Sequence, residues 1–287
     1  MTGRVALLAW FAPRQRAYPW RGARDTYRVL VSEVMLQQTQ AARVAPAYRS
    51  FVRRFPTVRA LARASRAEVV RAWGSLGYNR RAVALSEAAR IIVRDHGGRV
   101  PDRVETLARL PGVGPYTAAA VAALGHGMPV AAVDTNVRRV VARARIGRDD
   151  PNPLEVEAAA AAWLDRGDPG SWNQALMDLG REVCRPVPRC EACPLSRTCR
   201  FRLLGATPAP TPRRQGPFQG SFRQLRGAVI RELRAVDSAT LGSLAARVGR
   251  SPDSVVAAVR RLAAEGLVRA GPAALDGRPS GRVRLGP

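Results

Sequence analysis

The chain has 287 residues, enough for one large domain or for two to three small ones. Its formal net charge is +25 and its pI is about 11.7, so we expect a polyanionic partner, with nucleic acid ahead of an acidic membrane surface. All 47 basic residues are arginine. Catalysis through a lysine Schiff base is therefore excluded for the side chains, because arginine stays protonated and is not an amine nucleophile.

The N-terminal segment "VALLAWFAPRQR" is predicted to be a first helix. It is short, has arginines on its far side and lacks a clear small-residue cleavage site, so it does not resemble a signal peptide. The longest apolar stretch, residues 117–133, is interrupted by two glycines and a proline and is a poor membrane span. We expect a cytoplasmic, nucleoid-associated protein that does not contact membranes.

The segment "TYRVLVSEVMLQQTQ", residues 26–40, carries a single acid in an apolar setting. Helical spacing places Leu30, Glu33, Val34 and Gln37 on one face. If that face is buried, the pKa of Glu33 rises, and a carboxylic acid that keeps its proton near neutral pH is suited to general acid catalysis. The alternative is that Glu33 points outward between core residues, and this segment alone does not decide between the two.

Residues 1–204 are predicted to form one helix after another, with few strand patterns. Within them, "LPGVGPYTAAAV" at residues 110–121 places Pro111, Gly112 and Gly114 in a tight turn between two helices. This resembles a helix-hairpin-helix motif, in which backbone N–H groups and a helix N-terminus approach a phosphate. An ordinary helix connector is the alternative, and the full match, which extends through Thr117 and Ala118, favours the motif.

About twenty residues later, "VAAVDTNVRRV" places Asp134 after an apolar run and before Asn136. Asp134 is well suited to capping the helix that follows, which needs no catalytic role.

The four cysteines all lie in "CRPVPRCEACPLSRTC", at Cys184, Cys190, Cys193 and Cys199. Four cysteines within sixteen residues are unexpected for a set of reduced thiols without a function. Zinc sites usually have two close pairs separated by a longer loop, whereas this compact spacing fits a four-iron four-sulfur cluster better. Disulfides are not expected in a cytoplasmic protein.

The C-terminal part has a different pattern. Residues 205–220 are rich in proline and glycine and are predicted to be a linker. Residues 221–287 are predicted to form three helices and a two-stranded wing, a winged helix-turn-helix domain, with Ser251 capping the third helix and Pro252 in its first turn. Residues 205–287 hold 14 arginines and 5 acids, and the rest of the chain is also basic, so both parts could face the same DNA.

Six segments occur in one order: "VSEVMLQQTQ", "LGYNRRA", "LPGVGPYTAAA", "VDTNVRRV", "WNQALMDLG" and the cysteine loop. Together they resemble the adenine DNA glycosylase (MutY) family of the helix-hairpin-helix (HhH-GPD) superfamily, which includes endonuclease III, over residues 5 to about 204. The resemblance implies an all-α, two-lobed glycosylase domain at residues 1–204. A helical barrel lobe would span about 22–130, and a cluster lobe would combine 1–21 with 131–204.

The resemblance also implies a reaction and a partner. A monomeric enzyme of base excision repair would bind double-stranded DNA that contains a mismatch and remove adenine opposite 8-oxoguanine or guanine. Glu33 would protonate the adenine, Asp134 would stabilise the oxocarbenium-like sugar, and Tyr116 and Asn136 would orient them. Bifunctional relatives carry a lysine where this chain has Tyr116, so no Schiff-base lyase activity is expected. One 4Fe-4S cluster per chain is implied on the four cysteines.

By the same mapping, Gln38 and Tyr78 would wedge into the duplex beside the vacated space. The base pocket would be lined by Arg16, Trp20, Leu36 and Gln174. Two more residues, Gln37 and Thr39, would also bind the substrate. The hairpin residues expected at the DNA backbone are Gly112, Val113, Gly114 and Thr117.

Two features depart from the family pattern. Five residues separate Cys184 from Cys190, where the family usually has six. Many MutY proteins end in a Nudix-like β-rich domain that recognises 8-oxoguanine, and this tail is too short and too helical for that. The winged helix could take over part of the recognition, clamp DNA without specificity, or dock a protein.

Two other functions compete with adenine excision. One is removal of thymine or uracil opposite guanine, since relatives of that kind share the tyrosine, the aspartate and the cluster. Glu33 within "SEVMLQQTQ" argues against it. The other is a DNA-binding regulator that uses the cluster as a sensor and the winged helix as a reader. The complete pair of Glu33 and Asp134 argues against this one.

Overall fold

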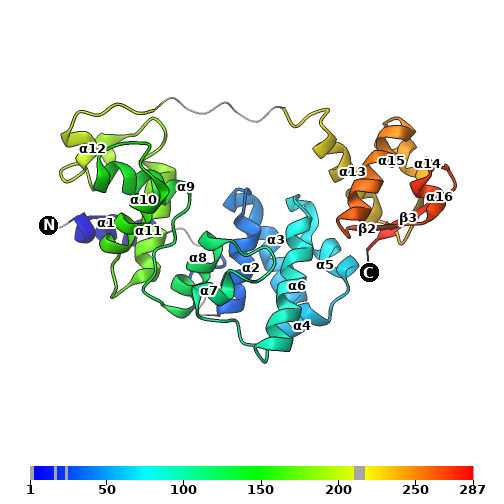
Figure 1. Cartoon of the computed structure of the whole chain (residues 1–287), viewed down its shortest axis with the longest axis horizontal. Coiled ribbons are helices and arrows are strands. Elements are labelled where there is room, and N and C mark those ends of the chain that lie inside the picture. Colours follow the sequence, from blue (N-terminus) through cyan, green and yellow to red (C-terminus); the bar gives the residue numbers. More distant parts are fainter. Residues whose placement is uncertain (1–2, 16–17, 23–24, 210–216, 287) are drawn as a thin grey trace. The chain divides into compact units, whose positions relative to one another are not determined.

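The computed structural model describes residues 3–15, 18–22, 25–209 and 217–286, and most of them are helical, which confirms the predicted helical fold (Figure 1). Contacts group the chain into two compact units. The first unit joins Met1–Val34 to Val100–Arg213, and the second joins Met35–Arg99 to Arg214–Pro287. The lobe boundaries implied by the family resemblance stay a prediction. None of the described helices combines the length and apolarity needed to cross a membrane.

The first unit is built around α11, which packs against α1, α8 and α9. Trp172 of α11 meets Trp163 edge to face, with ring centroids 5.1 Å apart, and Leu7 and Phe11 of α1 are fully buried in the same core. Burial of each such side chain contributes about 1.5–3 kcal/mol. The elements of this unit are α1 (Gly3–Phe11), η1 (Ala12–Arg14), α2 (Thr26–Leu36, whose last two residues belong to the second unit), α7 (Val104–Leu107), α8 (Pro115–His126), α9 (Thr135–Val141), η3 (Ala142–Ile146), α10 (Pro153–Trp163), α11 (Pro169–Glu182), η4 (Cys190–Ala192) and α12 (Arg200–Leu203).

Two glycines let helices of the first unit approach closely. A Cβ at Gly125 of α8 would lie 2.7 Å from the Thr26 side chain at the start of α2. A Cβ at Gly180 of α11 would lie 2.7 Å from Cβ of Asn136 on α9. Any larger residue would push these helices apart, so the two glycines fix how α2 meets α8 and how α9 meets α11.

The second unit combines a helical part with the C-terminal part. In the helical part, Phe51 packs edge to face on both Phe55 and Trp73. Ser65 and Glu68 form a capping box at the start of α5, which fixes where that helix begins. The elements of this part are α3 (Ala41–Arg54), α4 (Val58–Arg63), α5 (Arg66–Trp73), η2 (Gly74–Leu76) and α6 (Arg80–Asp95).

The C-terminal part has three main helices and a small antiparallel sheet of order β1-β3-β2. Ser251 accepts a hydrogen bond from Ser254 N and Pro252 opens α15, so the predicted N-cap is confirmed. In the sheet, Ala239 pairs with Val283 and Val268 pairs with Leu285. The elements are α13 (Phe222–Arg234), β1 (Ala239–Thr240), α14 (Leu241–Val248), α15 (Pro252–Ala264), β2 (Val268–Ala270), α16 (Pro272–Leu275) and β3 (Arg282–Leu285).

Candidate active site

Glu33 lies on the buried face of α2, with 5% of its surface exposed, so the outward-pointing alternative is wrong. The helix begins at Thr26 because the Asp25 carboxylate accepts hydrogen bonds from the N–H groups of Tyr27 and Arg28. Burial raises the pKa of Glu33 from 4.5 to about 7, the nearby charge of Asp134 adds to the rise, and a hydrogen bond from Tyr116 opposes it. Glu33 therefore holds its proton up to about neutral pH.

Tyr116 is the second residue of α8, and its hydroxyl donates to Glu33 Oε2 at 3.0 Å. The same hydroxyl lies 3.8 Å from Sδ of Met177 on α11. Burial raises the pKa of Tyr116 well above its ordinary value, so the phenol stays neutral and remains a donor. Tyr116 thus fixes one carboxyl oxygen of Glu33, as expected for a residue that orients the acid.

Asp134 both caps a helix and presents a carboxylate beside Glu33. Its Oδ1 accepts from the N–H groups of Asn136 and Val137, at 2.9 and 2.7 Å, at the start of α9. Its Oδ2 accepts from Asn136 Nδ2 at 3.0 Å. The capping role considered as an alternative is therefore correct, and it also fixes the carboxylate. A carboxylate that faces three N–H donors is held as a rigid anion, which suits it to stabilising a cation.

Arg139 extends this hydrogen-bond network toward the cysteine loop. Its guanidinium donates to Asn136 Oδ1 at 3.0 Å, to Gly180 O at 2.7 Å and to Cys184 O at 2.6 Å. Arg139 was not predicted from the sequence to have a role at the site. Its partners Gly180 and Cys184 are more than forty residues away in sequence, so no local pattern could have shown the contact.

The hairpin has the predicted geometry. Gly112 adopts φ 76° in the turn between α7 and α8, and Gly114 occupies the N-cap position of α8 before Pro115. Gly112 and Gly114 are exposed, whereas the side chains of Val113 and Thr117 are buried. A contact with DNA at this turn would therefore use the backbone around the glycines and not the Val113 or Thr117 side chains.

Gln38 and Tyr78, the predicted wedge residues, are both exposed and share an unusual backbone. Their φ angles are 53° and 45°, and among the residues that the structure describes no other non-glycine has a positive φ. Such conformations are strained and tend to occur at functional sites.

Arg81 ties together the loops that carry these two residues. Its guanidinium donates to the carbonyls of Met35 and Gln37, to Thr39 Oγ1 at 3.0 Å and to Gly77 O at 3.3 Å. Burial lowers its pKa to about 10, so it stays charged. Arg81 was not predicted from the sequence, although its position four residues before Leu85 places it on the apolar face of α6, an unusual position for an arginine.

The remaining predicted substrate residues are distributed over both units. Arg16 lies outside the described residues. Trp20 stacks on Tyr18 with ring centroids 4.9 Å apart, and Gln174 is half-buried on α11, both in the first unit. Leu36, Gln37 and Thr39 belong to the second unit. Their grouping into one base pocket stays a prediction.

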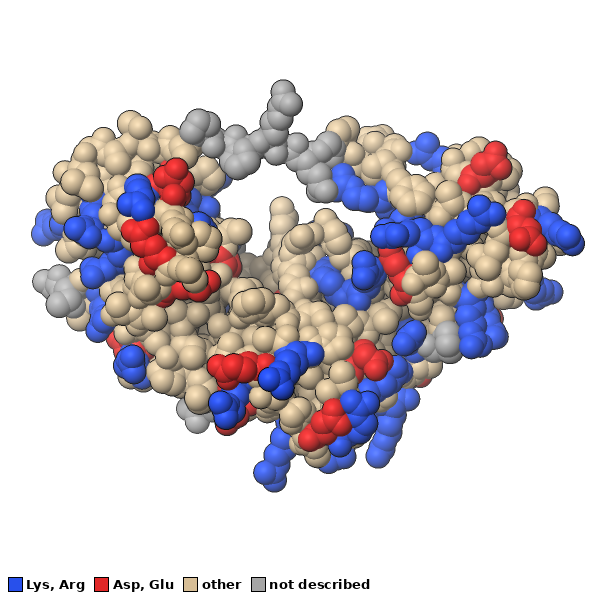
Figure 2. Space-filling model, in the orientation of Figure 1, with Lys and Arg blue, Asp and Glu red and all other residues tan. Residues whose placement is uncertain are grey.

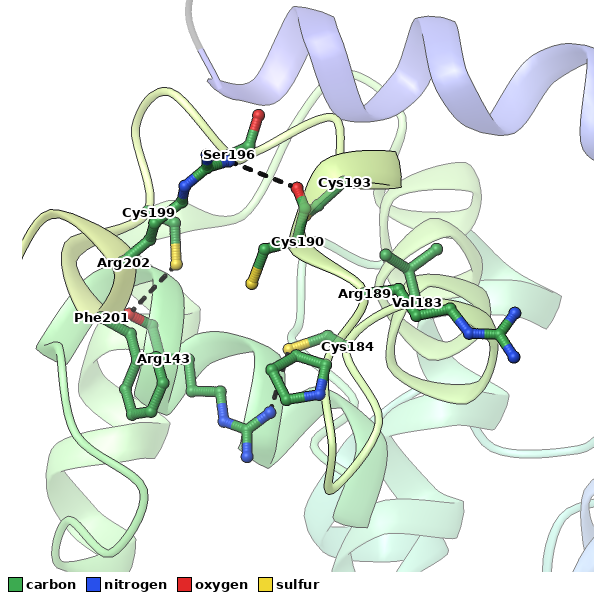
Figure 3. Close-up of a pocket in the computed structure, with 11 residues that line it drawn as sticks. Arg143, Val183, Cys184, Arg189, Cys190, Cys193, Ser196, Cys199, Phe201 and Arg202 are labelled. Carbon is green, nitrogen blue, oxygen red and sulfur yellow. Dashed lines mark hydrogen bonds between the residues drawn. The ribbon is translucent and has the colours of Figure 1, made fainter. Parts of the chain in front are cut away.

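The four cysteines line a single hollow in the first unit. Figure 3 shows the sulfur atoms of Cys184, Cys190 and Cys199 directed into the same space. Burial raises the pKa of Cys193 to about 12. Within the described part of the chain, no group of three or more His, Cys, Asp or Glu side chains is arranged to hold a metal ion. The residues that line the hollow are Arg143, Val183, Cys184, Pro188, Arg189, Cys190, Cys193, Ser196, Cys199, Phe201 and Arg202.

Arg143 closes the loop between the first two cysteines. This arginine is 2% exposed, pairs with Asp149, and donates to Arg185 O at 2.7 Å and to Pro186 O at 3.0 Å. Its Nη1 lies 3.9 Å from Cys184 Sγ. The five-residue gap is therefore held in a turn that keeps Cys184 at the hollow. Arg143, like Arg139, was missed by the sequence analysis.

Residues 31–166 match the family described as HhH-GPD superfamily base excision DNA repair protein. The adenine DNA glycosylase of Mycobacterium tuberculosis is 47% identical over 238 residues, which are 80% of this chain and 78% of that protein. The human adenine DNA glycosylase is 43% identical over 213 residues, 69% of this chain and 39% of the human protein.

Thymine and uracil glycosylases are also similar, at lower identity. The thymine/uracil-DNA glycosylase of Methanothermobacter thermautotrophicus is 33% identical over 68% of this chain and 90% of its own. Among solved structures, a thermostable thymine-DNA glycosylase has a TM-score of 0.65 at 32% identity, covering 70% of this chain and 94% of its own. An endonuclease III–DNA complex has a TM-score of 0.60 at 26% identity, covering 71% and 98%. The helical fold agrees with the match to the repair family and with the similarity to the two adenine DNA glycosylases. The chain belongs to the adenine DNA glycosylase family of the HhH-GPD superfamily.

Proposed function

We propose that this enzyme removes adenine from a mismatch in double-stranded DNA by hydrolysing its N-glycosidic bond. The observation that carries the proposal is the pair of carboxyl groups formed by the buried Glu33 and the partly buried Asp134. Glu33 keeps its proton to about pH 7, and Asp134 is fixed by three N–H donors. Groups with these different environments serve as general acid and as cation stabiliser in glycoside hydrolysis.

In the proposed reaction, Glu33 donates its proton to a ring nitrogen of the flipped adenine. The bond between the base and C1′ then breaks, and adenine leaves with the bonding electron pair. Asp134 stabilises the positive charge that develops on the sugar. Water adds to C1′ and returns a proton to Glu33, so an abasic site and free adenine are the products. Tyr116 and Asn136 keep the two carboxyl groups in place through the hydrogen bonds described above.

Duplexes that each carry one defined mismatch test this proposal. We expect loss of adenine opposite 8-oxoguanine and opposite guanine, with thymine and uracil opposite guanine left intact. The similarity to thymine/uracil glycosylases makes removal of those bases the second candidate function. Loss of thymine or uracil with adenine retained would establish that candidate in its place.

The same assay tests for lyase activity. No side chain here can form an imine, because the chain has no lysine and Tyr116 follows the hairpin. Strand breaks should therefore appear only after alkali treatment, and borohydride should not trap the enzyme on abasic DNA through a side chain. Efficient trapping after the N-terminal amine has been blocked would contradict this.

We further propose that Cys184, Cys190, Cys193 and Cys199 hold one 4Fe-4S cluster. The four thiols that line one hollow are the donor set that such a cluster takes, although the described side chains are not arranged around a metal ion. Arg143 beside Cys184 and Arg202 at the rim would offset the negative charge of thiolate ligands. When bound, the cluster would supply a rigid cross-link to this loop. Arg139 would connect the backbone of that loop to Asn136 and so help to fix Asp134.

The cluster can be tested in the purified protein. We expect a brown preparation with broad visible absorbance from sulfur-to-iron charge transfer and about four irons per chain. An active, colourless protein that contains one zinc would contradict the assignment.

Residues 221–287 are proposed to be a winged helix-turn-helix domain that adds to DNA binding. Three helices followed by an antiparallel pair of strands support this, as does the basic charge of the C-terminal region. On the face seen in Figure 2, arginines outnumber acidic residues over both units, with the two signs interspersed.

Removal of the tail should weaken binding and change its salt dependence. Each phosphate contact that is lost should make the log–log slope shallower by roughly one. A chain that ends at Leu204 should still release adenine, because Glu33 and Asp134 lie before that residue. A preference for 8-oxoguanine over guanine that falls on truncation would identify the tail as its reader. Unchanged affinity and slope would contradict DNA binding by the tail.

A further inference from the structure

Arg234 connects the C-terminal part to the helical part of the second unit. It is the last residue of α13 and is half-buried. Its Nε donates to Val70 O at 3.0 Å, and its Nη2 donates to Asn79 Oδ1 at 2.7 Å. Burial lowers the pKa of Arg234 to about 10, so the side chain remains charged at neutral pH and both bonds are charge-assisted.

The two acceptors lie at opposite ends of one short segment. Val70 O belongs to the last turn of α5, where carbonyls lack a helical partner and attract a positive charge. Asn79 occupies the N-cap position of α6, yet its side chain makes no capping hydrogen bond. Its Oδ1 is bound by Arg234 instead. Arg234 therefore spans residues 70–79, a segment that includes η2 and Tyr78.

Tyr78 has the strained backbone within that segment. Its φ is 45° and its side chain is 50% exposed. On the α6 side, Arg81 N donates to Tyr78 O at 2.9 Å, and the Arg81 guanidinium lies 5.4 Å from the Tyr78 ring centroid. A strained conformation persists only where its surroundings hold it. Asn79, the residue after Tyr78, is held by the hydrogen bond from Arg234 of the C-terminal part.

We propose that Arg234 is a positioning residue for Tyr78. Through Arg234, the C-terminal part holds the loop of residues 77–79 in the conformation from which Tyr78 enters the duplex. This inference rests on the proposed function, in which Tyr78 occupies the space left by the flipped adenine. The C-terminal part would then assist base extrusion by positioning Tyr78, a role separate from the effect of its positive charge on DNA binding. Loss of the Arg234 hydrogen bonds would let residues 77–79 relax from their strained conformation. Tyr78 would then occupy the space left by the flipped adenine less often.

The test uses the full chain and a duplex with 2-aminopurine next to the mismatched adenine, since the fluorescence of this probe rises when stacking is lost. Arg234→Lys keeps the charge but cannot bridge two acceptors in the same way. Asn79→Ala removes one acceptor. We expect each change to lower the extruded fraction and the single-turnover rate roughly tenfold, the usual size for a hydrogen bond to a charged group. The salt slope of DNA binding should be unchanged.

Two comparisons distinguish positioning of Tyr78 from simple docking of the C-terminal part on the helical part of the second unit. Asp237→Asn removes the exposed ion pair between Asp237 and Arg71, at 3.3 Å, which belongs to the same contact but does not touch residues 77–79. The Asp237→Asn variant should match the unmodified chain in the extruded fraction and in the single-turnover rate. The double variant of Arg234→Lys with Asn79→Ala should be no worse than Arg234→Lys alone, because both changes break the bond between Arg234 and Asn79.

The inference is overturned if Arg234→Lys and Asn79→Ala keep normal fluorescence and rate, or if Asp237→Asn is impaired to the same degree as they are. Additive losses in the double variant would also overturn it. These outcomes leave the proposed function intact as long as the unmodified chain releases adenine. A chain that releases no adenine would instead refute the proposed function.

Discussion

Replacement of Glu33 by glutamine should reduce adenine release by about 10²–10⁴-fold while DNA binding persists. The amide has nearly the same shape as the carboxyl group and can still accept from the Tyr116 hydroxyl, but it cannot deliver the proton that the leaving adenine requires. Single-turnover kinetics on an adenine mismatch, together with a binding titration, measure the two effects separately. Normal release by the variant would exclude Glu33 as the acid.

The same substitution should stabilise the fold at alkaline pH. The pKa of Glu33 is raised from 4.5 to about 7, so its contribution to stability is fully present below about pH 4.5 and is lost as the pH rises through about 7. Glutamine does not titrate. Relative to the unmodified chain, the variant should therefore gain roughly 3 kcal/mol in free energy of unfolding between pH 4.5 and pH 8. Chemical denaturation at both pH values measures this gain, and a pH-independent difference would contradict burial of an ionisable Glu33.

Replacement of Asp134 by asparagine should reduce adenine release by about 10²–10³-fold, because the fixed negative charge is lost where positive charge develops. Asparagine is a good N-cap, so the start of α9 should survive. The new amide nitrogen would face Asn136 Nδ2, and loss of that hydrogen bond should cost about 1 kcal/mol of stability. Removal of the charge should also lower the pKa of Glu33 and move the alkaline loss of activity to lower pH.

Two further variants separate charge from structure at this position. Asp168 caps α11 by accepting from Ser171 N and faces solvent, so Asp168→Asn repeats the capping change without touching the site. It should leave the rate unchanged. Asn136→Ala removes the bond to Asp134 Oδ2 but keeps the charge, and it should cost less than Asp134→Asn. An Asp134→Asn enzyme with a normal rate would limit Asp134 to capping.

The parts of the site that were predictable from sequence are those set by local pattern. Helical spacing indicated the helix face that Glu33 shares with apolar residues but left its burial open, and glycine spacing indicated the hairpin before Tyr116. Asp134 was harder, because an N-cap and a catalytic carboxylate leave the same local pattern. The structure gives it the cap and places it beside Glu33, so the two interpretations were compatible.

Three arginines, one buried and two partly buried, were missed for a physical reason. Arg81, Arg139 and Arg143 each donate to backbone carbonyls that lie about 40 residues or more away in sequence. A carbonyl is present at every residue, so sequence carries no sign of which one is used. In a chain where every basic residue is arginine, the few that act inside the fold are hidden among those that face solvent or DNA. Only for Arg81 does the apolar face of α6 give a local signal.

We expect a buried, protonated Glu33 to drive adenine release, and the pH dependence of the single-turnover rate tests this role most directly. The rate on an adenine mismatch should be level below pH 7 and should fall about tenfold per pH unit above it, since the acid form disappears through a pKa of about 7. The residual rate of Glu33→Gln should lack this transition. A rate that stays constant from pH 6 to pH 9, or a Glu33→Gln enzyme that follows the same curve as the unmodified chain, would contradict the account.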